Sequence, residues 1–135
     1  SEEAEDEASG FGQYARWWDY SGPVKRGDAT EPDWNGITSF DHPTNPNYPA
    51  HWHIREDGWM GASLTRHHAL ELSKEKPLRL RYLLHVHADR YDPLVAKRVA
   101  RAFESWPWLT IEKSSKKHQV YELIPDPSAT HENQD

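Results

Sequence analysis

The 135-residue chain contains no cysteine, and its 22 acidic and 16 basic side chains give a net charge of −6 at pH 7. The length suits one domain with a real core, and the lack of cysteine excludes disulfides, thiolate catalysis and cysteine-based metal sites. No apolar run is long enough for a membrane span and no basic–aromatic stripe is present, so we expect neither a membrane nor a nucleic acid as partner. Seven tryptophans and an aromatic content of 12% favour a mainly β protein, because aromatic side chains suit a pleated, half-buried surface.

Acidic residues crowd the two ends of the chain. Residues 1–7 and 126–135 hold eight of the 22 acids and no Lys or Arg, so the body between them is close to neutral. We predict flexible tails over 1–12 and 125–135 around a single β-sandwich-like domain over 13–124. The first residue is not Met, which leaves room for a removed leader or half-domain. We expect a soluble protein and leave its compartment open, with a secreted or periplasmic location as one option.

Strands are predicted from period-two alternation bounded by turn residues. Tyr14–Tyr20 alternates in this way, and Ser21-Gly22-Pro23 is expected to end the strand. Further strands are expected over 37–40, 58–64, 68–72, 78–87, 108–113 and 118–124. The strand over 78–87 has the clearest pattern, because leucine, tyrosine and valine occupy one face of it.

One helix is predicted over about 92–106. Asp92 is a suitable N-cap, Pro93 suits the first helical position, and Pro107 stops the helix. Together with the strands, this predicts an antiparallel β-sandwich with one C-terminal α-helix.

The segment 41–55 concentrates histidine, proline, amide and carboxylate side chains, and it is the predicted location of a functional site. A carboxylate near an imidazole can fix its tautomer and yield an acid or base that works near neutral pH. Asp41, His42 and His53 are therefore candidate catalytic residues, and Asn45 is a candidate for substrate binding. The alternative is that these polar side chains only stabilise the loop through turns.

Two His-x-His pairs provide an alternative site. In a strand, His51 and His53 project to one face, as do His85 and His87. Such a pair can supply two nitrogens to a divalent metal. We expect no metal or other cofactor, and keep a metal bound by these four histidines as the alternative.

Aromatic rings beside polar side chains suggest a sugar ligand. Trp52 and Trp59 could stack on the C–H face of a sugar, and Arg55 could bind its hydroxyls or a carboxylate.

Three segments together resemble one soluble bacterial family: ARWWDYSG (15–22), NGITSFDHPTNPNYPAHWHIR (35–55) and PLRLRYLLHVH (77–87). The family carries the label "methane oxygenase PmoA", although it resembles neither a membrane copper enzyme nor a protein that handles methane. The resemblance covers residues 15–106 and the C-terminal half of longer family members. It implies an all-β sandwich and a role near carbohydrate-degrading and sugar-oxidising enzymes. The shared polar positions are Asp41, His42, Asn45, His53 and His87, with Trp17, Asp19 and Tyr20 on the preceding strand.

These observations predict a carbohydrate-binding or carbohydrate-active domain, whose partner is a carbohydrate or another small polar molecule. The expected substrate-binding residues are Asn45, Trp52, Trp59, Arg55, His87 and Tyr20. A metal-dependent, cupin-like enzyme and a non-catalytic structural or interaction module are the alternatives, so whether the chain is an enzyme stays open. An absent N-terminal half would leave edge strands exposed, and a homo-oligomer could cover them.

Overall fold

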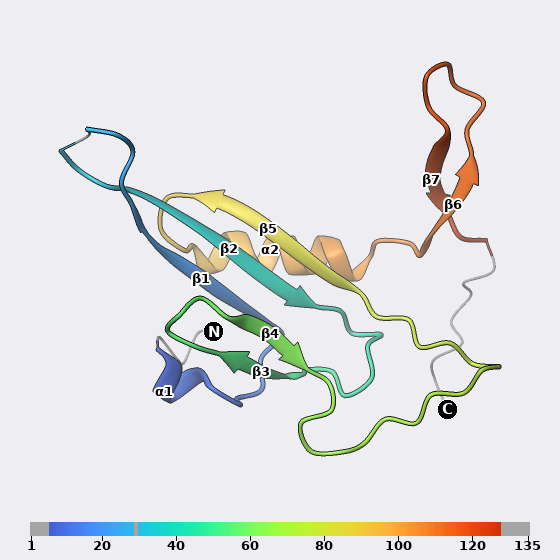
Figure 1. Cartoon of the computed structure of the whole chain (residues 1–135), viewed down its shortest axis with the longest axis horizontal. Coiled ribbons are helices and arrows are strands. Elements are labelled where there is room, and N and C mark those ends of the chain that lie inside the picture. The colour runs from blue at the N-terminus through green and yellow to red at the C-terminus, as the bar shows by residue number, and fades with distance from the viewer. Residues whose placement is uncertain (1–5, 29, 128–135) are drawn as a thin grey trace. The chain divides into compact units, whose positions relative to one another are not determined.

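The computed structural model describes residues 6–28 and 30–127. Its elements are α1 (Glu7–Gly10), β1 (Trp17–Val24), β2 (Asp33–Asp41), β3 (His51–Ile54), β4 (Met60–Ser63), β5 (Tyr82–Ala88), α2 (Pro93–Glu104), β6 (Leu109–Lys113) and β7 (Tyr121–Pro125) (Figure 1). The chain divides into two compact units, one ending at Glu104 and the other beginning at Ser105. No helix of the described residues is long and apolar enough to cross a membrane.

A three-stranded antiparallel sheet in the order β1-β2-β5 organises the first unit. Its register places Trp17 opposite Phe40, and Phe40 opposite Leu83. Since side chains alternate between the two faces of a strand, this register assigns each residue of the sheet to one face. The central strand β2 is the most buried, because both faces of its second half are covered.

Helix α2 covers one face of this sheet and runs behind β2 and β5 in Figure 1. Trp17 and Phe40 from the sheet pack with Ala96 and Phe103 from the helix in one buried cluster. The helix begins where predicted, because the Asp92 carboxylate accepts the Leu94 N–H at 2.8 Å.

The antiparallel pair β3–β4 packs on the opposite face of the sheet. Trp18 from β1 meets Trp52 and Ile54 from β3 in a second buried cluster. Trp52 is completely buried, and its indole N–H donates to the Ala15 carbonyl at 2.7 Å. The described residues thus form seven strands in three antiparallel sheets, and the predicted mainly β, sandwich-like fold with one long helix is confirmed.

Several strands differ in extent from the prediction, and the short strand β3 lies inside the segment 41–55 that was expected to be a loop. The first strand does not end at Ser21-Gly22-Pro23 but continues to Val24. Pro23 is tolerated because β1 is an edge strand, where a missing N–H need not break a ladder. The predicted strand over 78–87 begins only at Tyr82, and residues 68–72 form no strand.

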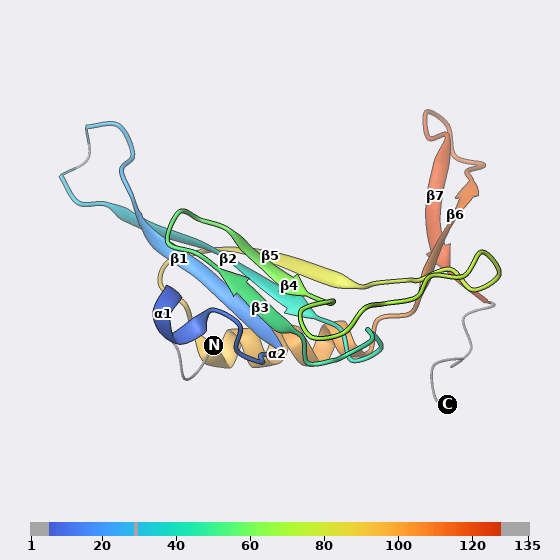
Figure 2. The ribbon, with the colours of Figure 1, turned by 60° about the horizontal axis from the view of Figure 1, so that its bottom comes forward.

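The predicted tails lie partly outside the described residues, which exclude 1–5 and 128–135. Within the N-terminal segment, Asp6 and Ser9 form a capping box at the start of α1. Gly10 is buried against the Trp18 indole, where a Cβ atom would come within 2.3 Å of the ring (Figure 2 shows α1 from below). In the second unit, β6 and β7 pair as an antiparallel hairpin close to the strands expected over 108–113 and 118–124.

Candidate functional site

The loop between β2 and β3 is closed by its own polar side chains. The Asn45 amide nitrogen donates to Asp41 Oδ1 and to the Arg81 carbonyl, both at 2.7 Å. The Arg81 N–H donates back to Asn45 Oδ1 at 2.7 Å, and the Ala50 N–H donates to Asp41 Oδ2 at 3.0 Å. Burial raises the pKa of Asp41, while the hydrogen bonds from Asn45 and Ala50 oppose that rise. Asp41 and Asn45 therefore tie the loop to the chain segment before β5, a long-range contact beyond the local turns that the structural alternative predicted.

His42 is packed inside the protein, with only 2% of its surface exposed. Its ring meets the Phe103 ring edge-on at 4.8 Å between centroids, and its Nδ1 accepts the Thr44 N–H at 3.1 Å. Burial, followed by the nearby Arg81 charge, lowers the pKa of His42, although the Phe103 and Glu104 carbonyls act in the opposite direction. The ring is therefore neutral near pH 7, and this depth of burial separates it from a bound substrate.

The two histidines of β3 point away from the three-stranded sheet. Trp52 and Ile54 alternate with them and pack toward Trp18, so His51 and His53 lie on the outer side of β3. The His53 ring contacts Phe11 at 4.9 Å between centroids.

His51 is held by its own local contacts on this outer side. Its Nδ1 lies 2.6 Å from the Gly12 carbonyl oxygen. The centroids of the His51 and Tyr14 rings are 3.6 Å apart. These contacts join the segment before β1 to β3.

His87 lies on the opposite, helix-covered face of the sheet. Its Nε2 is 2.8 Å from Asp19 Oδ2, which also accepts the Thr38 hydroxyl at 2.7 Å. The side chains of His87 and Asp19 are only 13% and 6% exposed. His85 stacks near His87 at 6.0 Å between ring centroids, and both line a cavity of about 100 Å³ beside the start of α2.

The structure does not gather the predicted residues into one pocket. The three-stranded sheet lies between His87 and His53, and Asn45 is buried in the loop. Trp52 is completely buried and has no face free for a sugar, whereas Trp59 is 66% exposed. The expectation of a single site fails because alternation along β3 turns the histidines outward and the tryptophan inward.

The alternative of a metal site finds no ligand set in the described part of the chain. Among residues 6–28 and 30–127, no three His, Asp or Glu side chains gather closely enough to hold a metal ion. The two His-x-His pairs belong to different sheets.

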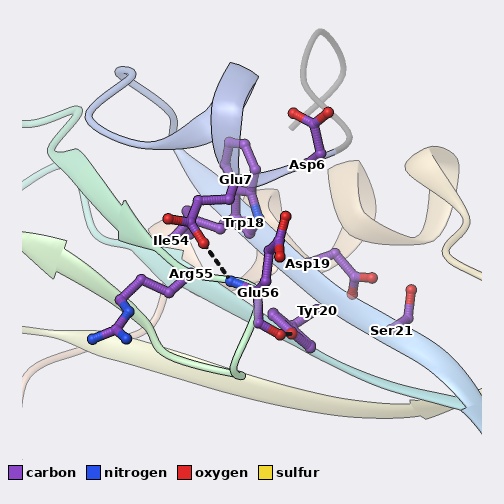
Figure 3. A pocket seen from close by; sticks show the side chains of 9 residues that line it. All are labelled: Asp6, Glu7, Trp18, Asp19, Tyr20, Ser21, Ile54, Arg55 and Glu56. Carbon is purple, nitrogen blue, oxygen red and sulfur yellow. Dashed lines mark hydrogen bonds between the residues drawn. The ribbon is translucent and has the colours of Figure 1, made fainter.

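A cleft of about 320 Å³ lies at the free edge of β1, between α1 and the end of β3 (Figure 3). Its lining residues are Asp6, Glu7, Trp18, Asp19, Tyr20, Ser21, Ile54, Arg55 and Glu56. Two of them, Tyr20 and Arg55, were predicted from the sequence to bind a substrate. The Glu7 carboxylate accepts the Glu56 N–H at 2.7 Å, and the Tyr20 hydroxyl donates to the Glu56 carbonyl at 2.7 Å.

The sequence analysis missed the acidic residues of this cleft. The sequence pattern places Glu7 in a predicted flexible tail and gives no signal for Glu56. Asp19 was noted as a shared position without a role. Alternation places Asp19 on the same face of β1 as Trp17, so its carboxylate lies on the helix-covered face with Thr38 and His87.

A protein-family model for a family of unknown function (DUF6807) matches residues 1–101. No curated protein and no solved structure matches the chain. The match gives no support to the label "methane oxygenase PmoA" or to a carbohydrate ligand. It covers well over half of the sequence, and the chain therefore belongs to this family of unknown function, DUF6807.

Proposed function

We propose that the chain binds a carbohydrate in the cleft beside β1. The observation that carries this proposal is the combination of polar and apolar side chains around a cavity of about 320 Å³. Ligand pockets in proteins begin at about 300 Å³, so the cleft has room for a small sugar.

The cleft offers the groups that a sugar requires. The carboxylates of Glu7 and Glu56 can accept hydrogen bonds from sugar hydroxyls, whereas the Arg55 guanidinium is already paired with Asp57 at 2.7 Å. Trp18 and Ile54 form the apolar floor of the cleft but are only 4% and 3% exposed, so the exposed apolar surface there comes mainly from the Tyr20 ring, which is 37% exposed. Carboxylates outnumber basic groups in the lining, which disfavours an anionic ligand such as a phosphate.

The walls of the cleft are joined before any ligand binds. The hydrogen bond from the Glu56 N–H to Glu7 connects α1 to the end of β3, and the Tyr20 hydroxyl connects β1 to the same residue. Both bonds use the backbone of Glu56, so its carboxylate is left for a ligand. Walls fixed in this way lower the entropy lost on binding.

Calorimetry and two-dimensional NMR with a panel of neutral mono- and disaccharides test the proposal. We expect shifts in the amide signals of Tyr20 and Glu56 for at least one sugar and none for inorganic phosphate. Glu56→Ala keeps both backbone hydrogen bonds and should weaken binding about tenfold, the effect of losing about 1.4 kcal/mol. Glu112→Ala removes an exposed acid from the second unit and serves as the control. No shift with any sugar would reject the proposal.

A further inference from the structure

Strand β5 forms an open edge of the three-stranded sheet. It pairs with β2 on one side, and no strand of the described residues pairs with its other side. An open edge presents a row of unpaired N–H and C=O groups that can pair with another strand.

The face of the sheet beside this edge is apolar and exposed. Leu84 and Val86 of β5 are 65% and 72% exposed, and Ile37 of β2 is 42% exposed. Register places all three on the face that β3–β4 cover near Trp18. The covered cluster and the exposed patch therefore lie on one continuous face.

Nothing in the sequence of β5 protects its edge. Tyr82–Ala88 reads YLLHVHA, without Lys, Arg, Asp, Glu or Pro. Natural edge strands are commonly guarded by charges or proline, or covered by another element. An edge without these features is suited to pair with a second strand.

We propose that two copies of this chain associate through antiparallel pairing of their β5 strands. A two-fold axis at His85 places Leu84 of each copy opposite Val86 of the other, so the apolar patches join on one face. The same register brings Arg81 of one copy to the level of Asp89 in the second, which makes the ends of the strand complementary in charge. The result is a six-stranded sheet with both apolar patches side by side.

Sedimentation velocity over about 1–200 μM protein, the range of a weak to moderate interface, tests the association. We expect a concentration-dependent dimer. The double variant Leu84→Lys/Val86→Lys places like charges opposite each other and should raise the dimer dissociation constant at least about tenfold. Leu72→Lys, which charges another leucine that is 70% exposed, should leave the dimer intact.

Hydrogen exchange on the unmodified protein locates the contact without a variant. Amides of β5 that point away from β2 should become protected as the concentration rises, and the alternate amides should not change. A monomer at every concentration would overturn the proposal. A dimer without protection of these β5 amides, or one that the double variant does not weaken, would also overturn it.

Discussion

His87 Nε2 lies 2.8 Å from Asp19 Oδ2, although β2 separates the strands that carry the two residues. The imidazole reaches the carboxylate by passing over Gly36, which faces His87 in the β2–β5 register and Ser21 in the β1–β2 register. A Cβ atom at Gly36 would lie 2.6 Å from the His87 ring and 2.6 Å from the Ser21 Cβ. The pair therefore depends on a glycine in the central strand.

Gly36→Ala should break this pair and destabilise the protein. The added methyl group must displace the His87 ring or the backbone of β1, and overpacking of this kind costs about 1–3 kcal/mol. Urea unfolding measures the loss, and NMR of the His87 ring protons reports its displacement. Gly22→Ala is a matched control on the neighbouring strand, because nothing lies within 4 Å of the Cβ it would add. Equal stability of the two variants would contradict the role of Gly36.

Asn45→Ala should be among the most destabilising changes in the loop. The Asn45 side chain makes three hydrogen bonds of 2.7 Å, and its loss leaves the Arg81 N–H and one Asp41 oxygen without these partners. We expect a loss of about 2–4 kcal/mol in the free energy of unfolding, because buried polar groups lose their partners. Asn35→Ala, at an exposed position of β2, is the control and should cost far less. A small effect at Asn45 would show that the loop does not depend on these bonds.

His42 should make the protein less stable in mild acid. Its pKa is lowered from 6.5 in the folded state, so the neutral ring is favoured there. As the pH falls below 6.5, the unfolded chain takes up a proton at this position before the folded protein does, and the free energy of unfolding decreases. Once the pH is below the folded-state pKa as well, this decrease is complete.

Urea unfolding at pH 7.5 and pH 5.5 measures the effect of His42. His42→Gln should be less stable at pH 7.5, because the ring packs on Phe103, but should lose less stability between the two pH values. His68→Gln, at an exposed histidine, controls for the general effect of removing a histidine. A pH dependence unchanged in His42→Gln would refute the assignment.

The fold was predictable where local chemistry decides it. Asp92 and Pro93 marked the start of α2, and alternation marked the strands that became β1 and β5. The ends of the strands were less predictable, because they depend on which strands lie next to one another in the sheet. Pro23 stays in β1 only because that strand lies at the edge of the sheet, and the sequence does not reveal strand order.

The candidate site was harder to predict, because a polar side chain can either bind a ligand or hydrogen-bond to the protein's own backbone. The polar density of the loop predicts ligand binding, yet Asp41 and Asn45 bond to the loop itself, since a buried loop must satisfy its backbone groups. The Asp19–His87 pair joins residues 68 positions apart. It follows from the register of β1, β2 and β5, which no local pattern specifies.

The two tryptophans proposed to stack on a sugar should respond differently to substitution. Trp52 is completely buried and its indole N–H donates to the Ala15 carbonyl at 2.7 Å, whereas Trp59 is 66% exposed. Trp52→Phe leaves that carbonyl without its partner and a gap in the core, which should cost about 2 kcal/mol. Trp59→Phe should change the free energy of unfolding by less than about 0.5 kcal/mol. Urea unfolding measures the stability of the two variants. Equal losses of unfolding free energy would place Trp59 in the core as well and would contradict its 66% exposure.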